Sequence, residues 1–479
     1  MRLGQTSFVY FVSKFFGSII GFFATIYFAR ILGETVLGQY ALAIAIVTWL
    51  TIIGNVGFGT AITKRVSEGR EPEQYLGAGM IIMSSMMAVV LLFTFLFRLQ
   101  IDAYVGAPVS KIIMLLLLVT LYKSLVNALL KGSHLVHIYA VLSTTKLALR
   151  AISQVALVAL IGLGLTGMLY GYAFGYFVAA TIGLFILKLR PAIPSYEHIK
   201  SLFDYAKYSW LGNIESKTFD TADIAILGFF VTQGFVGVYS IAWSLGKFLN
   251  IFGNAVSNSF FPEMSKVANK KNPEAITHLI EDTLSFAGLI LIPGLVGSLV
   301  IGDRLMAVYG EGFIIGTEVL VILIAGLLIY TYNTQLLNTL NAIDRPDLAF
   351  RSNLVFILMN IALNFILVWQ IGWVGAAIAT VLSSTAGLCF AFYYTRQQVA
   401  FRVPINETGR QWIAAISMGV IVYVFRIGIE IQIPQIAAVN EIFVVLLVIV
   451  GSIAYFLILF VIWAQFRDTV VNNLPTEIQ

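Results

Sequence analysis

Four ionisable side chains fall on one apolar stretch of the chain, between Ser209 and Phe229. They are Glu215, Lys217, Asp220 and Asp223. At about 100° per residue, a helix would gather most of the polar side chains of this stretch into one arc of roughly 120°: Ser209, Asn213, Lys217, Asp220 and Asp223. A charge near the centre of a bilayer costs at least ~2.5 kcal/mol, so this face must look onto protein or water. The chemistry open to these groups is ion pairing or ion binding in a polar interior.

Two interpretations of this stretch stay open. Lys217 and Asp220 lie three residues apart, so they can form an internal ion pair that holds the helix against a neighbour. That pair leaves Glu215 and Asp223 unexplained. A wet pathway for a substrate or an ion accounts for all four groups.

The composition places these groups in a membrane protein. Of the 479 residues, 59% are hydrophobic and 11% are charged, and the mean hydropathy is +0.91. Soluble domains have about a quarter charged residues. The single cysteine, Cys389, excludes a disulfide framework and a multi-cysteine metal site.

Fourteen segments are long and apolar enough to cross a hydrocarbon core of about 30 Å, which predicts an all-α, polytopic membrane fold. They fall near residues 7–29, 38–61, 76–97, 111–131, 139–162, 165–188, 204–230, 236–261, 279–300, 316–339, 350–370, 373–395, 411–428 and 441–464. Two pairs, at 139–188 and 350–395, are separated only by Gly-rich turns. We expect the first segment to be a retained helix, because no small-residue cleavage site follows it.

Lys and Arg are distributed unevenly between the connections. Eighteen of the 29 lie at the chain ends or in even-numbered connections and five lie in odd-numbered ones, which predicts that both termini are cytoplasmic. The other six lie within predicted spans: Lys14, Lys123, Lys146, Arg150, Lys217 and Lys247. Cations are therefore unusually frequent inside the predicted membrane region.

The chain also contains a repeat. Sliding the sequence by 199 residues aligns Gly38 with Gly237 and Tyr40 with Tyr239, without a gap. Further on, the turn at 164–167 resembles the turn at 372–375 at an offset of 208 residues. Helices one to six thus resemble helices seven to twelve. We expect two parallel six-helix lobes, at 1–190 and 200–397, followed by two more helices and a short tail at 405–479.

The run FARILGETVLGQYALAIAIV at 28–47 follows the first predicted helix. It resembles the N-terminal motif of the Wzx-like polysaccharide or oligosaccharide flippases, which belong to the multidrug/oligosaccharidyl-lipid/polysaccharide exporter superfamily. The similarity extends over the whole chain, including the helix number, the repeat and the glycine turns. The resemblance implies a two-lobed transporter that moves a polyprenyl-linked glycan to the outer leaflet by alternating access.

A polyprenyl-linked sugar carries a phosphate or diphosphate, which needs a counter-charge in a low-dielectric region. Lys and Arg supply that charge. The candidate head-group contacts are Lys14, Arg30, Lys146, Arg150, Lys217 and Lys247. The alternative for each is that its long side chain reaches the membrane surface or pairs with a neighbouring acid.

Glu215, Asp220 and Asp223 are candidates for ion coupling, because carboxylates in a partly desolvated cavity can bind H⁺ or Na⁺. The alternative is a structural salt bridge with Lys217 or Lys247. The expected partners are the polyprenyl-linked glycan, membrane lipids and the enzymes that assemble the glycan. We expect no cofactor, metal site or nucleic-acid partner.

Three other functions are alternatives to glycan flipping. A multidrug/cation antiporter would not need six cations in the membrane, whereas an anionic cargo would. A lipid II-type flippase shares the number of helices. A membrane-embedded glycosyltransferase would need acids or histidines on sizeable outer loops, and the odd-numbered connections are short. We therefore expect a transporter, not an enzyme, in the cell membrane of a prokaryote.

Overall fold

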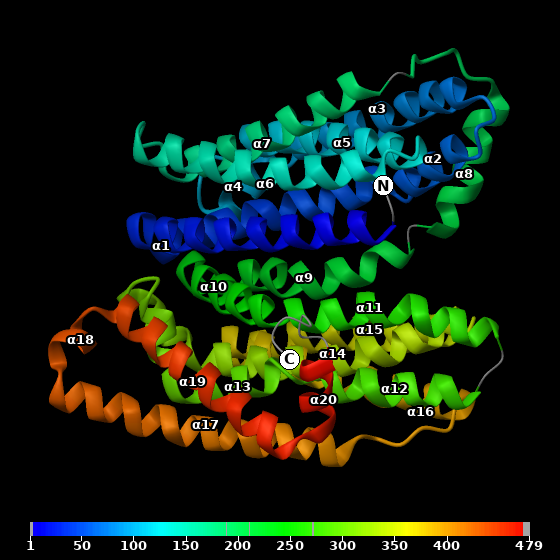
Figure 1. Cartoon of the computed structure of the whole chain (residues 1–479). Coiled ribbons are helices and arrows are strands. Elements are labelled where there is room, and N and C mark those ends of the chain that lie inside the picture. The colour runs from blue at the N-terminus through cyan, green and yellow to red at the C-terminus, as the bar shows by residue number, and fades with distance from the viewer. Residues whose placement is uncertain (1–2, 188, 210, 271–272, 473–479) are drawn as a thin grey trace. The chain divides into compact units, whose positions relative to one another are not determined.

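The computed structural model describes the backbone of residues 3–187, 189–209, 211–270 and 273–472 (Figure 1). Side chains are described at these positions except 3–19, 208–209, 211–218, 258, 269, 273 and 472. All regular structure within the described backbone is helical. The predicted all-α, polytopic fold is confirmed.

The chain divides into two compact units, Met1–Gly237 and Val238–Gln479. The first unit contains α1 to α9 and the first turn of α10. Their bounds are α1 Leu3–Asn55, α2 Phe58–Ser67, α3 Pro72–Leu96, α4 Arg98–Val105, α5 Ser110–Gly132, α6 Val136–Ala159, α7 Gly164–Ile186, α8 Tyr196–Ser209, α9 Leu211–Phe230 and α10 Gln233–Leu249.

The second unit contains the rest of α10 and the helices that follow. Their bounds are α11 Ile251–Asn269, α12 Pro273–Ala287, α13 Leu291–Ala307, the 3₁₀ helix η1 Glu311–Gly316, α14 Thr317–Ala342, α15 Pro346–Ile371, α16 Trp373–Gln398, α17 Ile405–Gln432, α18 Pro434–Ala438, α19 Asn440–Ile462 and α20 Ala464–Asn472.

Among the described residues, 11 helical segments are long and apolar enough to cross a membrane, or up to 12 if α10 and α11 form one bent span. The first predicted span and most of the second fall in α1, which breaks at Gly33 with φ 76° and ψ 176°, and the second span ends within α2. The predicted divisions within 139–188 and 350–395 are present as α6 and α7 and as α15 and α16. The number of 14 spans stays a prediction.

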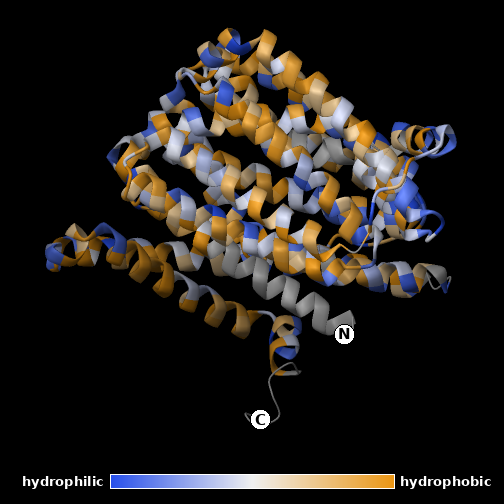
Figure 2. Ribbon diagram, turned by 90° about the horizontal axis from the view of Figure 1, so that it is seen from above, coloured by the Kyte–Doolittle hydropathy of each residue, from blue (hydrophilic) through white to orange (hydrophobic). Residues whose placement is uncertain are grey.

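Each unit is built around one central helix. In the first unit, α5 packs against α1, α2, α3, α6 and α7 and fully buries Leu116 and Leu117. In the second unit, α14 packs against α11, α12, α13, α15 and α16 and fully buries Leu323 and Leu327. Hydrophobic residues run along the helices, whereas hydrophilic residues gather at helix ends and in loops (Figure 2). That distribution is what a lipid environment requires.

The turns before α6 and α15 have the same backbone conformation. His134 and Asp344 are 210 residues apart, and each has φ 59°, which is uncommon for residues other than glycine. Each turn is closed by an equivalent 2.9 Å backbone hydrogen bond, from Leu135 N to the Leu130 carbonyl and from Arg345 N to the Leu340 carbonyl. This correspondence supports the internal repeat.

Gly38 and Gly237, which the repeat aligns, meet within the first unit. A Cβ on Gly38 would overlap the carbonyl oxygen of Gln233, and a Cβ on Gly237 would overlap that of Glu34. Each glycine therefore packs against the backbone carbonyl that lies one helical turn before the other glycine. Only residues without a side chain allow membrane helices to cross this closely.

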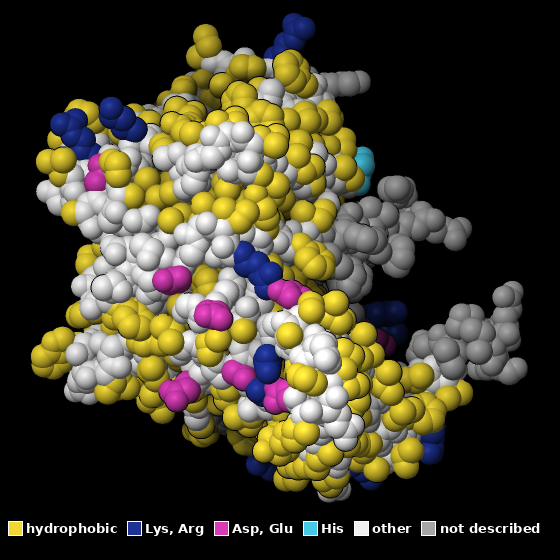
Figure 3. Space-filling view, turned by 90° about the vertical axis from the view of Figure 1, so that its left-hand side faces the viewer, with side chains coloured by type: hydrophobic (Ala, Val, Ile, Leu, Met, Phe, Trp, Pro, Cys, Tyr) yellow, Lys and Arg dark blue, Asp and Glu magenta, His cyan; other side chains and the backbone are white. Residues whose placement is uncertain are grey.

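Ion pairs join α13 to α17 in the second unit. Arg426 donates to both carboxylate oxygens of Asp303, at 2.9 and 2.6 Å, and to Glu430 at 3.1 Å. Arg304 donates to the same Glu430 oxygen at 2.8 Å. Figure 3 shows a face of the molecule on which basic side chains lie beside acidic ones. Two cations and two anions thus compensate one another at this junction.

Candidate functional site

Polar side chains recur at four-residue intervals on α6 and α7. Lys146, Arg150 and Gln154 follow one another on α6, and Tyr172 and Tyr176 do so on α7. Residues four apart lie on the same face of a helix. Because α6 and α7 pack along their length, the two polar faces meet in the interior of the first unit.

Glycines bring the two helices together at this point. A Cβ on Gly171 would lie 2.6 Å from the backbone N of Gln154, and a Cβ on Gly175 would lie 2.6 Å from that of Arg150. Ordinary contacts begin at 3.4 Å. The helices therefore touch backbone to backbone, and this contact fixes where the tyrosines of α7 meet the cations of α6.

Arg150 joins three helices. Its Nη2 donates to the Tyr40 hydroxyl on α1 at 2.8 Å, and its Nε donates to Gln154 Oε1 at 3.3 Å. The guanidinium lies over the Tyr172 ring, 4.8 Å from its centroid. Gln154 is buried, and its Nε2 donates to the Tyr40 hydroxyl at 3.1 Å and to the Met168 carbonyl at 2.6 Å. The guanidinium is held rigidly against α1 and α7.

Two lysines contact the aromatic ring of Tyr176. Lys123 Nζ on α5 lies 5.1 Å from the centroid of Tyr176, and Lys146 Nζ on α6 lies 4.7 Å from it. The Tyr176 ring stacks on Tyr172 with a centroid distance of 4.2 Å and an interplanar angle of 19°. We call the whole group the cation–tyrosine cluster, which consists of Tyr40, Lys123, Lys146, Arg150, Gln154, Tyr172 and Tyr176.

The cluster carries three positive charges. Among the described residues, no carboxylate forms an ion pair with Lys123, Lys146 or Arg150. The four contributing helices are all among the segments apolar enough to cross a membrane. Cation–π contacts with tyrosine stabilise such charges only in part. The arrangement can bind an anion, and it offers no nucleophile and general base in contact for catalysis.

The cluster combines two of the cations that the sequence predicted, Lys146 and Arg150. Arg30 lies exposed on α1. Lys247 lies exposed on α10 in the second unit, with its Nζ 6.0 Å from the centroid of Trp243. The side chains of Lys14 and Lys217 lie outside the described residues. The role of each of these residues stays a prediction.

Two of the three predicted acids are described. Asp223 on α9 is 6% exposed, and Asp220 is half-buried one turn earlier on the same helix. The side chain of Glu215 lies outside the described residues. Both acids lie on α9, which packs against α1 within the first unit.

Sequence reasoning missed Lys123 and all three tyrosines of the cluster as site residues. Lys123 was counted among the membrane cations but was not selected as a contact of the head group. Tyr172 and Tyr176 share a face four residues apart, which could have been detected. The contact of Arg150 with Tyr40 spans 110 residues of sequence, and no local pattern predicts it.

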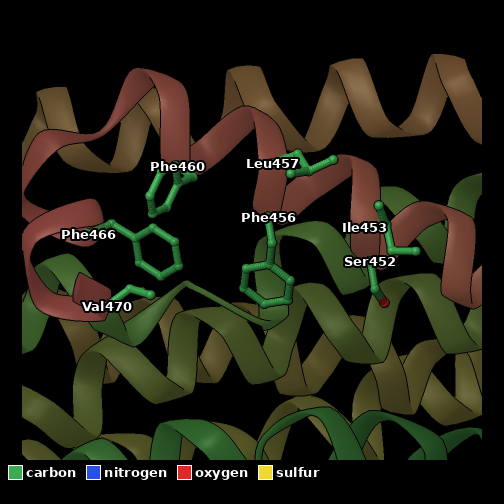
Figure 4. Close-up of a pocket in the computed structure, with 7 residues that line it drawn as sticks. All are labelled: Ser452, Ile453, Phe456, Leu457, Phe460, Phe466 and Val470. Carbon is green, nitrogen blue, oxygen red and sulfur yellow. The ribbon is translucent and has the colours of Figure 1, made fainter. Parts of the chain in front are cut away.

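A separate groove in the second unit has a different character. It has a volume of about 510 Å³ and lies between α19 and α20 (Figure 4). Its lining is Ser452, Ile453, Phe456, Leu457, Phe460, Phe466 and Val470. With one hydroxyl as its only polar side-chain group, this groove suits hydrocarbon and cannot compensate an anion.

Two protein families match the chain. The signature described as "Polysaccharide biosynthesis protein" matches residues 3–268, and that described as "Lipid II flippase MurJ" matches residues 221–450. Two Haloferax volcanii proteins are similar over their full length. "Probable flippase AglR" is 29% identical over 486 residues, which cover 100% of this chain and 99% of that protein. "Probable low-salt glycan biosynthesis flippase Agl15" is 27% identical over 478 residues, which cover 99% of each.

A solved structure shares the fold. The chain superposes on "Lipid II flippase MurJ, inward closed conformation" with a TM-score of 0.80 at 17% sequence identity, covering 97% of this chain and 100% of that one. The polytopic architecture expected from the sequence is therefore that of a known membrane fold. Because the first family signature covers more than half of the sequence, the chain belongs to the polysaccharide biosynthesis protein family.

Proposed function

We propose that this protein moves a lipid-linked oligosaccharide or polysaccharide precursor across the cell membrane by alternating access. The observation that carries the proposal is the cation–tyrosine cluster, with three cations on membrane-spanning helices and no described carboxylate beside them. The two Haloferax relatives, both named as flippases, support transport rather than catalysis.

The physical argument concerns the phosphate of the lipid carrier. An unpaired anion in the apolar region of a bilayer is prohibitively costly. Lys and Arg side chains in the interior of the protein lower that cost by charge-assisted hydrogen bonds. The hydrocarbon tail needs no such help, since it can stay in lipid while the head group crosses.

The remaining parts of the proposal extend the sequence analysis. The lobes 1–190 and 200–397 rock against each other, with 405–479 appended. Both termini lie in the cytoplasm of a prokaryotic cell. Asp220 and Asp223 couple the movement to H⁺ or Na⁺, and glycan assembly enzymes deliver the substrate.

Lipid II-type flipping is the second candidate. The lipid II flippase signature over residues 221–450 and the shared fold favour it. Both substrates are glycans on a phosphorylated polyprenyl lipid, so the cluster suits either one. Export of a cationic drug is not favoured, because three uncompensated cations repel such a cargo.

Reconstitution tests the proposal. The purified protein is placed in liposomes that carry a fluorescent lipid-linked oligosaccharide in the inner leaflet, and exposure is followed with a membrane-impermeant glycosidase. We expect faster exposure than in protein-free liposomes. Parallel liposomes with lipid II, and with a cationic dye, separate the candidates. No acceleration for any lipid-linked glycan would refute the function.

A further inference from the structure

The three cations of the cation–tyrosine cluster differ in how their donors are used. The Arg150 guanidinium donates to Tyr40 and to Gln154 and stacks on Tyr172. Its planar fork suits such fixed contacts. Gln154 closes the arrangement by donating to Tyr40 and to the Met168 carbonyl. Arg150 therefore already has protein partners on α1, α6 and α7.

Lys123 and Lys146 have no such partners. Their ammonium groups contact the Tyr176 ring, and within the described part of the chain they form no hydrogen bond or ion pair. Each ammonium carries three N–H donors. These donors face the same aromatic ring from two different helices, α5 and α6. They are available to a ligand in a way that the donors of Arg150 are not.

The two lysines also repel each other. Since both touch one ring, their Nζ atoms lie at most about 10 Å apart, and like charges at that separation interact unfavourably in a medium of low dielectric constant. An anion that accepts hydrogen bonds from both lysines removes this repulsion. A phosphoryl group has several acceptor oxygens, and lysine binds phosphate as a point charge.

From this division of donors we infer that Lys123 and Lys146, with Tyr176 as their shared platform, form the subsite for the phosphoryl group of the cargo, and that Arg150 is a positioning residue. The inference rests on the proposed function, since it assigns one part of the lipid-linked glycan to one part of the cluster. It adds Lys123 to the residues that contact the cargo and removes Arg150 from them.

Binding is tested with polyprenyl phosphate, which carries the phosphoryl group without a sugar. The full-length protein in nanodiscs of neutral lipid is titrated with this probe, and the thermal unfolding midpoint is followed. We expect Lys123→Gln and Lys146→Gln to raise the half-saturating concentration about tenfold or more. Before ligand is added, the unfolding midpoint should not fall, because each substitution removes the repulsion between the two lysines. Lys146→Arg should keep most of the affinity, because it keeps the charge.

The matched control is Lys131→Gln. Lys131 is also on α5, and its Nζ also lies over a tyrosine, 4.3 Å from the centroid of Tyr139, but it is outside the cluster. We expect it to bind the probe as the unchanged protein does. Arg150→Gln should lower the midpoint without ligand. If Arg150→Gln keeps that midpoint and weakens binding as strongly as the lysine variants, the division of roles is wrong.

Two further arms identify the source of the phosphoryl group. In the first, inorganic phosphate is titrated in place of polyprenyl phosphate. In the second, the protein is placed in nanodiscs that contain phosphatidylglycerol, and no polyprenyl phosphate is added. Polyprenyl phosphate should act at a concentration at least tenfold below that of inorganic phosphate. Equal action of inorganic phosphate, or saturation by phosphatidylglycerol with the same dependence on both lysines, would overturn the assignment to the lipid carrier.

Flipping separates this inference from the proposed function. If the unchanged protein flips the glycan and Lys123→Gln and Lys146→Gln bind and flip equally well, the subsite is wrong and the function stands. If the unchanged protein flips no lipid-linked glycan, the function fails whatever the lysines bind.

Discussion

Replacing Gly175 by alanine tests whether the contact between α6 and α7 positions the cation–tyrosine cluster. The new Cβ would lie 2.6 Å from the backbone N of Arg150, whereas ordinary contacts begin at 3.4 Å. The helices must therefore separate by about 0.8 Å at a point where both partners are backbone atoms. Overpacking of this kind costs about 1–3 kcal/mol. The higher helix propensity of alanine offsets at most about 1 kcal/mol of that cost.

We thus expect Gly175→Ala to destabilise the protein by about 1–2 kcal/mol, a factor of roughly 5–30 in the ratio of folded to unfolded protein. The displacement also moves the rings of Tyr172 and Tyr176 away from Arg150 and Lys146, so flipping should fall more steeply than stability.

The control for this prediction is Gly297→Ala on α13. A Cβ there meets nothing within 4 Å, so the same substitution should leave the stability unchanged or slightly higher. The measurements are the unfolding midpoint in detergent and the flipping rate in liposomes. Gly175→Ala with a midpoint and a flipping rate equal to those of Gly297→Ala would refute the reasoning.

Three more predictions concern other contacts. Asp303→Asn should destabilise the protein by about 1 kcal/mol in thermal unfolding, because the half-buried Arg426 then has one acidic partner fewer. The double variant Asp303→Arg with Arg426→Asp, which reverses the ion pair, should restore part of that loss. Gly38→Ala should lower the unfolding midpoint more than Gly175→Ala does, since its Cβ would overlap a carbonyl oxygen outright; an unchanged midpoint would contradict the helix crossing. The hydrogen bond from the Lys207 ammonium, at 2.8 Å, holds the pKa of Asp204 below its usual 3.8. Any stabilisation from this exposed pair is complete above that value and is lost as the pH falls through the lower folded-state pKa, so Asp204→Asn should leave the midpoint at pH 7 unchanged, and a clear decrease there would show that the pair matters more than its exposure implies.

The sequence predicted the membrane class and most helix positions because the apolar runs must satisfy the bilayer locally. It predicted the separations of α6 from α7 and of α15 from α16 from the length of each apolar segment, since only a Gly-rich turn lies between the two helices of each pair. The predicted span 204–230 covers the end of α8 and all of α9, and the junction of these two helices at residue 210 lies outside the described residues. The bend at Gly33 was predicted only as a gap between two spans.

The candidate site was only partly predictable. Lys146 and Arg150 could be selected because charge in an apolar segment is costly wherever the segment packs. Their different roles could not be predicted, since these depend on Tyr40 and Tyr176, which come from other helices. Helical periodicity indicates which residues share a face, but it does not indicate which face of another helix they meet.

The crossing of Gly38 and Gly237 has a consequence for how the two halves of the gene can diverge. Each glycine contacts the backbone of the residue four positions before the other glycine. Each copy of the repeat therefore limits which side chains the other copy can accept at this position. Loop lengths and lipid-facing residues can drift independently. An insertion of one residue between the break at Gly33 and Gly38 would turn the glycine about 100° away from its partner. Chimaeras that join first and second halves from different relatives should therefore fold only where both parents keep this small residue in register.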